Sequence, residues 1–151
     1  MKSIYKASPT CDWKEEEYYI GDPCYVVCDD LWDEFCDILH GDKTKEGYTA
    51  YHDYLYMSVQ GVTIFVCGTA YGDGVYPCEV DYNHVGRCGV DAGLLSIIPM
   101  SAVKVWGKCD DVERLGVVIK AQKGYPTYDP NCGAMSWGNM CVDTDPGEAD
   151  E

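Results

Sequence analysis

The chain has 151 residues, a length that suits one domain of ordinary size, and 46% of them are apolar, which is enough to bury a core. It carries 26 acidic against 11 basic residues, giving a net charge of −15. This balance argues against binding to a nucleic-acid duplex or to an anionic membrane, since both need clustered Lys and Arg. The acidity favours solubility and would suit a basic protein partner.

The ten cysteines are a high and even number, which would suit a disulfide framework. However, the first ten residues, MKSIYKASPT, lack the apolar stretch that a signal peptide needs. We therefore expect a cytoplasmic protein whose thiols stay reduced and pack as small apolar groups. No CxxC pair occurs, and the closest spacing is Cys24-x-x-x-Cys28, so we predict no metal site and no cofactor. No window approaches the length of a membrane span.

The first regular element is expected after Trp13. Residues 15–20 give a β signal, which is interrupted by the turn Gly21–Asp22–Pro23. Pro23 fixes its own φ and favours an extended conformation for Asp22. The apolar run Cys24–Cys28 then predicts a short buried strand.

A helix is predicted over residues 29–40. Asp29 or Asp30 suits its N-cap, and the acidic first turn complements the helix dipole. Apolar residues recur at helical spacing and would face the core. The helix is expected to end at His40, before Gly41.

The later chain predicts mostly strands. The clearest segments are 54–58, 62–69, 75–80, 88–98 and 115–119, and residues 101–106 are expected to form a turn followed by a strand. From Gln122 onward the sequence is rich in Gly, Pro and Asn. We predict an α+β, mainly β fold, in which a rolled antiparallel sheet or small barrel carries one packed helix. Residues 1–142 would form a single globular domain and residues 143–151 a flexible acidic tail.

Three aspartates beside glycines are the candidates for a shared site. Asp22 follows Gly21, Asp73 lies between Gly72 and Gly74, and Asp91 precedes Ala92–Gly93. Grouped carboxylates at strand ends bind cations or the hydroxyl and amino groups of ligands. Asp beside Gly is also ordinary turn chemistry, in which the side chain bonds to nearby backbone N–H groups, and this alternative applies to each of them.

The segments IGDPCY (20–25), GTAYGDGVY (68–76) and VDAGLLSIIP (90–99) occur in that order. In this respect the chain resembles a group of uncharacterised small proteins of bacteriophages and bacteria, over residues 19–99. The resemblance implies a phage or bacterial origin, with the protein in the cytoplasm of the bacterial host cell, and it implies no particular activity.

The segments that surround these aspartates predict a ligand-binding site. Aromatic rings there would stack on a planar group, glycine N–H groups and Arg87 would meet an anion, and the carboxylates would bind polar groups. The predicted ligand-binding residues are Asp22, Tyr25, Tyr71, Gly72, Asp73, Gly74, Tyr76, Arg87, Asp91 and Gly93. The motifs of common hydrolases and phosphate-binding loops are missing, so we predict no catalytic residue and favour a non-enzymatic function.

Three functions remain open. The first is a non-enzymatic ligand-binding accessory protein, for example a phage anti-defence protein that sequesters a nucleotide-type signal. The second is an acidic protein-interaction module, such as an inhibitor or immunity-type protein that covers a basic surface of a host protein. The third is a metal-dependent hydrolase that uses the clustered aspartates. The partner would be a small molecule or a host protein, and the sequence leaves the oligomeric state open.

Overall fold

The computed structural model describes residues 4–6, 13–40, 54–59, 62–69, 74–90, 94–107, 112–129 and 133–144. Eleven strands and three α-helices occupy this part of the chain. The elements of the first half are β1 (Ile4–Lys6), β2 (Glu17–Gly21), the 3₁₀ turn η1 (Pro23–Tyr25), α1 (Asp29–His40), β3 (Tyr54–Val59), β4 (Val62–Gly68) and β5 (Gly74–Val80). They are followed by β6 (Asn83–Val90), β7 (Leu94–Pro99), α2 (Met100–Trp106), α3 (Val112–Leu115), β8 (Val117–Lys120), β9 (Thr127–Asp129), β10 (Ala134–Trp137) and β11 (Met140–Asp143).

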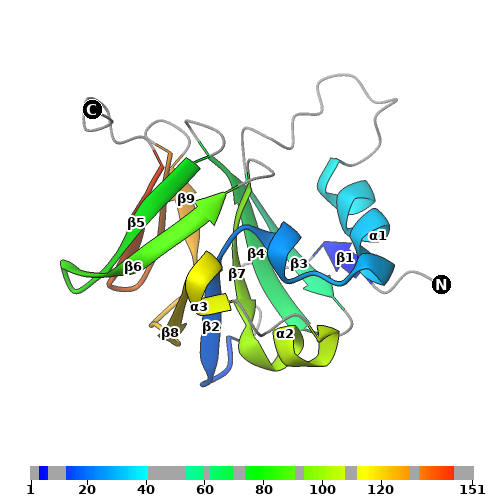
Figure 1. The fold of residues 1–151 in the computed structure, drawn as a ribbon, viewed down its shortest axis with the longest axis horizontal. Coiled ribbons are helices and arrows are strands. Elements are labelled where there is room, and N and C mark those ends of the chain that lie inside the picture. Colours follow the sequence, from blue (N-terminus) through cyan, green and yellow to red (C-terminus); the bar gives the residue numbers. More distant parts are fainter. Residues whose placement is uncertain are drawn as a thin grey trace.

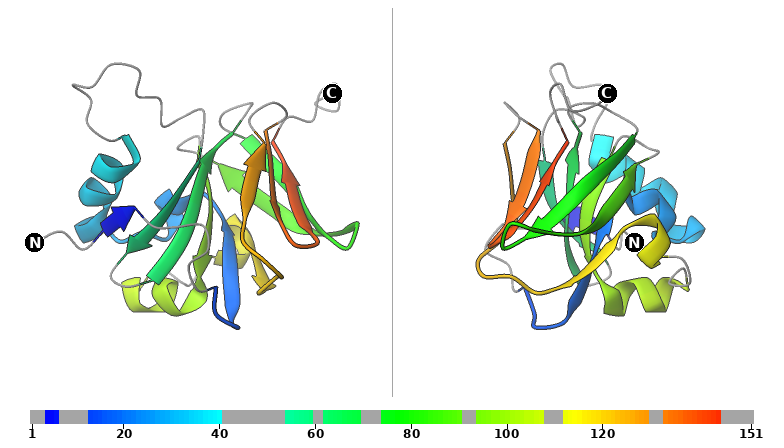
Figure 2. Two further views of the ribbon diagram at one scale, coloured as in Figure 1. Left: turned by 180° about the vertical axis from the view of Figure 1, so that it is seen from behind. Right: turned by 60° about the vertical axis from the view of Figure 1, so that its left-hand side comes forward.

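The strands form two antiparallel sheets. A six-stranded sheet has the order β1-β3-β4-β7-β2-β8, and a five-stranded sheet has the order β6-β5-β11-β10-β9. The six-stranded sheet is the middle layer, with α1 and α2 on one side and the second sheet on the other (Figures 1 and 2). The mainly β, α+β prediction is confirmed. The sheets do not close into a barrel, because the second sheet packs on the first instead of continuing it.

Two apolar cores separate the three layers. On the helix side, Phe35 of α1 and Val103 of α2 pack against Ile64 and Ile98 of the middle sheet. Between the sheets, Trp137 packs against residues of β2, β4 and β7. Successive side chains of a strand point to opposite faces, so these three strands are buried on both sides. This arrangement explains why β4 and β7 are almost entirely apolar, with Thr63 and Ser96 as their polar residues.

The helix at 29–40 has its predicted bounds. Two other local predictions are wrong. The segment after Asp22 forms the 3₁₀ turn η1 and not a strand, since the Asp22 side chain caps the turn and Pro23 occupies its first position. Residues 100–106 form α2 and not a strand. This helix ends at Gly107, whose φ of 78° is left-handed and whose N–H bonds back to the Val103 and Lys104 carbonyls.

The C-terminal strands β9, β10 and β11 complete the second sheet. Met135, Trp137 and Val142 point into the core between the sheets, where each is fully buried. Asp143 is the last residue of β11. Thr144, which follows the strand, is buried, and its N–H bonds to the Gly133 carbonyl; residues 145–151 lie outside the described part. The region rich in Gly, Pro and Asn therefore supplies one wall of the core.

Candidate functional site

The predicted corner at Gly21–Asp22–Pro23 lies where β2 ends. The Asp22 carboxylate accepts a hydrogen bond of 2.8 Å from the Cys24 N–H and so caps η1. Asp22 is completely buried. Its observed role matches the turn chemistry that the sequence left open as an alternative.

Two buried hydroxyl groups, from Ser96 and Tyr19, also hold the backbone of the corner at Asp22. Ser96 Oγ on β7 donates a hydrogen bond of 2.6 Å to the Gly21 carbonyl, and the Tyr19 hydroxyl donates one of 2.9 Å to the Asp22 carbonyl. Burial, with a further contribution from the Asp22 carboxylate, raises the pKa of Tyr19 well above its usual value. In the described residues no buried side-chain N or O atom lacks a hydrogen-bond partner. The corner is therefore internally satisfied.

The other two aspartate motifs fall on segments that the structure does not describe. Tyr71, Gly72, Asp73, Asp91 and Gly93 are all among these residues. The residues that flank them are described: Gly68 pairs with Leu94, and Gly74 pairs with Val90. In the middle sheet, Gly21 pairs with Ser96, two residues from Leu94. Strand pairing thus places Gly21 and the Gly68–Leu94 pair at one end of the middle sheet.

The remaining predicted ligand residues have different surroundings. Tyr76 is 3% exposed and packs in the core between the sheets. Tyr25 is half-buried, and its ring lies over Gly89 of β6, where an added Cβ would be 3.7 Å from the ring. Arg87 is exposed on β6, and Gly74 begins β5 next to the Tyr76 ring. Of this set, Arg87 and Tyr25 offer a solvent-accessible side chain.

A pocket of about 130 Å³ lies at the opposite end of β2. Three separate segments meet there, because Tyr18 pairs with Pro99 across β2 and β7, and Thr63 lies at the same end of the neighbouring β4. The lining residues combine two opposite charges with hydroxyl and apolar groups: Lys14, Glu16, Tyr18, Val62, Thr63, Pro99 and Ser101. We call this the Lys14 pocket.

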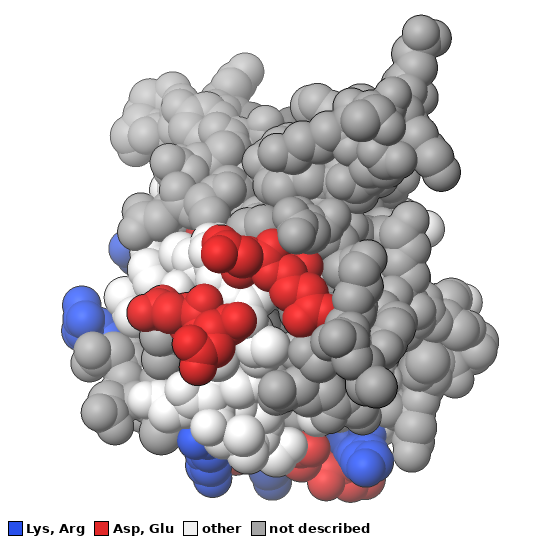
Figure 3. Space-filling model, turned by 90° about the vertical axis from the view of Figure 1, so that its right-hand side faces the viewer, with Lys and Arg blue, Asp and Glu red and all other residues white. Residues whose placement is uncertain are grey.

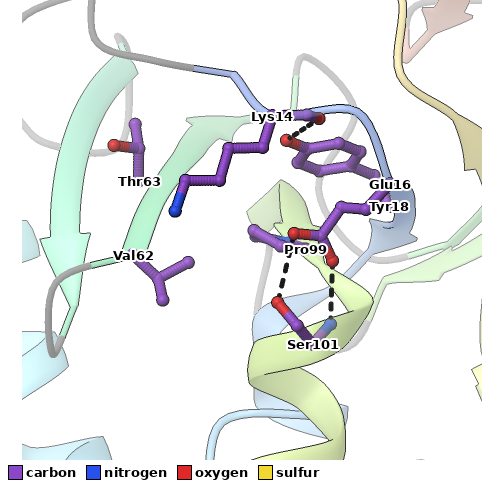
Figure 4. A pocket seen from close by; sticks show the side chains of 7 residues that line it. All are labelled: Lys14, Glu16, Tyr18, Val62, Thr63, Pro99 and Ser101. Carbon is purple, nitrogen blue, oxygen red and sulfur yellow. Dashed lines mark hydrogen bonds between the residues drawn. The ribbon is translucent and has the colours of Figure 1, made fainter.

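The polar walls of the Lys14 pocket are held in place. The Glu16 carboxylate accepts hydrogen bonds from the Ser101 N–H, at 3.1 Å, and from Ser101 Oγ, at 3.2 Å. The Tyr18 hydroxyl donates to the Lys14 carbonyl at 2.8 Å. Figure 4 shows the Lys14 side chain extending from this fixed backbone toward Val62 and Thr63, across the hollow from Glu16. Among the described residues, the Lys14 ammonium makes no ion pair.

A second hollow, of about 180 Å³, adjoins the Lys14 pocket. It is lined by Val59, Val62, Ser101, Ala102, Val105 and Trp106, so Val62 and Ser101 line both hollows. Its walls are mostly apolar, and Val105 on α2 is 79% exposed at its edge. We call it the Val105 hollow.

A third hollow, of about 260 Å³, lies between the β5–β6 and β10–β11 turns. Glu79, Asp81 and the almost fully exposed Tyr82 contribute to it. Asp81 and Tyr82 both have positive φ, which makes this a tight hairpin turn of the type that suits twisted strands. The Asp81 N–H bonds to the Asn139 carbonyl and joins the two turns.

Sequence reasoning missed the Lys14 pocket. Residues 15–20 were predicted only as a strand, and residues 101–106 were predicted as a turn and a strand, so the helix start that holds Ser101 was not foreseen. Two signals were present: Lys14 is a lone base beside three glutamates, and Met100, Val103 and Trp106 recur at helical spacing. Neither signal shows that the two segments meet.

Among the described residues, no group of three or more His, Cys, Asp or Glu side chains could hold a metal ion. No helix in the described ranges is long and apolar enough to cross a membrane. No protein-family model, curated protein sequence or solved structure matches the chain.

Proposed function

We propose that the protein is a non-enzymatic binding protein that holds a small molecule in the Lys14 pocket. The observation that carries this proposal is the convergence of opposite charges and hydroxyls from three chain segments around one hollow. Binding sites combine a concave surface with a few convergent polar groups of this kind. The corner at Asp22, by contrast, uses its polar groups to hold its own backbone.

The pocket favours a small ligand. Pockets that enclose drug-sized molecules measure roughly 300–1,000 Å³, and the Lys14 pocket measures about 130 Å³. A nucleotide-type signal would therefore need contacts elsewhere, such as the Arg87 and Tyr25 region. The phage or bacterial origin that the resemblance implies, and the role against host defences, stay predictions.

The proposal is tested by titrating the ¹⁵N-labelled protein with a panel of small carboxylates, amines, zwitterions, sugars and nucleotides. We expect at least one small ligand to shift the amide signals of Val62, Thr63 and Ser101 saturably. Val62→Phe, which fills the pocket, should abolish the shift, and the control Val75→Phe on exposed β5 should leave it unchanged. A panel without any saturable shift at these amides would refute the proposal.

A second candidate function is the acidic protein-interaction module. On α1, Asp29, Asp30 and Asp33 are exposed and Glu34 is half-buried. Figure 3 shows acidic side chains gathered on the side of the molecule that carries this helix. Such a surface accelerates association with a basic partner and makes it sensitive to salt.

This candidate is tested by comparing two triple variants as baits in low-salt pull-downs from a bacterial lysate. Asp29→Asn/Asp30→Asn/Asp33→Asn should lose a partner that the wild type recovers. The control, Glu79→Gln/Asp81→Asn/Asp129→Asn, removes the same charge from the second sheet and should retain it. Recovery of the partner by the α1 variant would remove α1 as the contact, and equal loss by both variants would show that only net charge matters.

A further inference from the structure

The Lys14 pocket contains one cation and one anion, and it shares the lining residues Val62 and Ser101 with the Val105 hollow. We propose that it binds a free α-amino acid with an apolar side chain. The ligand carboxylate lies at the Lys14 ammonium, the ligand ammonium lies at the Glu16 carboxylate, and the side chain enters the Val105 hollow. This inference rests on the proposed function, that the Lys14 pocket holds a small molecule.

The charged groups have the capacity for both contacts. An ammonium has three donors, and no described residue pairs with that of Lys14. An ionised carboxylate offers about four acceptor sites, and Ser101 occupies two of those on Glu16 through its N–H and Oγ. These two bonds fix the position of the Glu16 carboxylate, and therefore the direction of its remaining acceptor sites. Fixed acceptors bind a ligand ammonium at a lower entropic cost than mobile ones.

The overall charge favours a zwitterion over a simple anion. With a net charge of −15, the protein repels a ligand that carries only a carboxylate. A ligand that carries only an ammonium is attracted to acidic residues over the whole surface and gains little specificity from this pocket. A zwitterion has no net charge, so its preference comes from the local pair of opposite charges at Lys14 and Glu16.

The neighbouring surface explains the choice of an apolar side chain. The Val105 hollow measures about 180 Å³ and is lined largely by Val, Ala and Trp side chains. Val62 and Ser101 line both spaces, so in the proposed complex the ligand side chain passes Val62 to reach this hollow. Covering the exposed Val105 removes apolar surface from water, which a polar or absent side chain would not do.

The chemistry is tested with four ligands in ¹⁵N NMR titrations of the whole protein. L-leucine should shift the Val62, Thr63 and Ser101 amides saturably. N-acetyl-L-leucine lacks the ammonium, L-leucinamide lacks the carboxylate, and glycine lacks the side chain, and each should bind at least about tenfold more weakly, corresponding to one lost contact of about 1.4 kcal/mol. Equal affinity for L-leucine and any one of the three would overturn the corresponding contact and with it the proposal.

Matched variants assign each contact to its residue. Lys14→Gln should weaken L-leucine binding but leave L-leucinamide binding unchanged, and Glu16→Gln should weaken L-leucine binding but leave N-acetyl-L-leucine binding unchanged. The exposed residues Lys123 and Glu17 provide the controls Lys123→Gln and Glu17→Gln, which should bind like wild type. Val105→Ser should reduce the preference for L-leucine over glycine, whereas Val75→Ser should not. Thermal unfolding of each variant confirms that it is folded.

Failure of this inference can be separated from failure of the proposed function. Suppose that no amino acid binds, but another small molecule shifts the same amides and loses this effect in the Val62→Phe variant. The amino-acid proposal is then overturned and the binding function stands. If nothing in the panel binds, both are overturned. If L-leucine binds and neither Lys14→Gln nor Glu16→Gln weakens its binding, the amino acid binds without the two proposed contacts, and the proposed site is refuted.

Discussion

Ser96 gives the most direct test of how the corner at Asp22 is held. It is fully buried on β7, and its Oγ donates a hydrogen bond of 2.6 Å to the Gly21 carbonyl on β2. Ser96→Ala removes this donor and leaves the packing nearly unchanged. A buried acceptor that loses its partner costs about 1–3 kcal/mol of the free energy of unfolding.

The expected cost can be measured by thermal and urea unfolding followed by circular dichroism. For a chain of this size, 1 kcal/mol corresponds to a Tm change of about 2–4 °C, so Ser96→Ala should lower Tm by roughly 2–12 °C. The matched control is Ser58→Ala on β3, a half-buried serine, which should change stability by less than about 0.5 kcal/mol.

Two outcomes would refute this reasoning. A Ser96→Ala protein as stable as the Ser58→Ala control would show that the Gly21 carbonyl finds another donor at no cost. A loss of ligand binding at the Lys14 pocket in a folded Ser96→Ala protein would contradict the placement of the corner and the pocket at opposite ends of β2. We expect ligand binding to be retained.

Three further predictions concern packing, pH and thiol access. In urea unfolding, Gly116→Ala should lower the free energy of unfolding by about 3 kcal/mol, because the added Cβ would lie 2.5 Å from a backbone oxygen of β2. Gly107→Ala is the comparison: Gly107 has a φ of 78° and open space around it, so this change should cost only about 1 kcal/mol. Burial, together with two neighbouring tyrosines, raises the pKa of Tyr56 to about 12, so its unfolded form ionises first, and stability should fall between about pH 10 and 12. In pH-dependent unfolding Tyr56→Phe should lose less stability over that range; an equal loss would contradict this assignment. In mass-spectrometric alkylation, half-buried Cys28 should react in the native protein, and Cys67, whose pKa is raised by burial, should react only on unfolding.

Local features of the sequence determined several elements. The helix at 29–40 follows from an acidic first turn, an apolar stripe and a glycine after its end, and these signals act within one segment. The apolar runs at 62–69 and 88–98 predicted strands, and β4 and β7, which form there, are buried on two faces. Pro23 and Asp22 indicated the turn after β2, although its continuation as η1 was missed.

The candidate site depended much less on local signals. Asp22 was correctly placed at a turn, but its carboxylate is directed to the Cys24 N–H and is fully buried. Whether a side chain serves its own backbone or a ligand is decided by what surrounds it, and here Ser96 comes from β7 and Tyr19 from β2. The structure leaves Asp73 and Asp91 outside its described residues, so their predicted role stays a prediction.

The sequence by itself determined which segments are apolar, that residues 29–40 are helical and that the chain turns after β2, because each of these depends on residues close together along the chain. Only the tertiary structure decided that β4 pairs with β7 while β5 and β6 join a second sheet with β11. That choice depends on burying both faces of the middle sheet at once, which involves residues from the whole chain. The Lys14 pocket is a product of the same pairing, since Glu16, Thr63 and Ser101 meet only after β2, β4 and β7 have aligned.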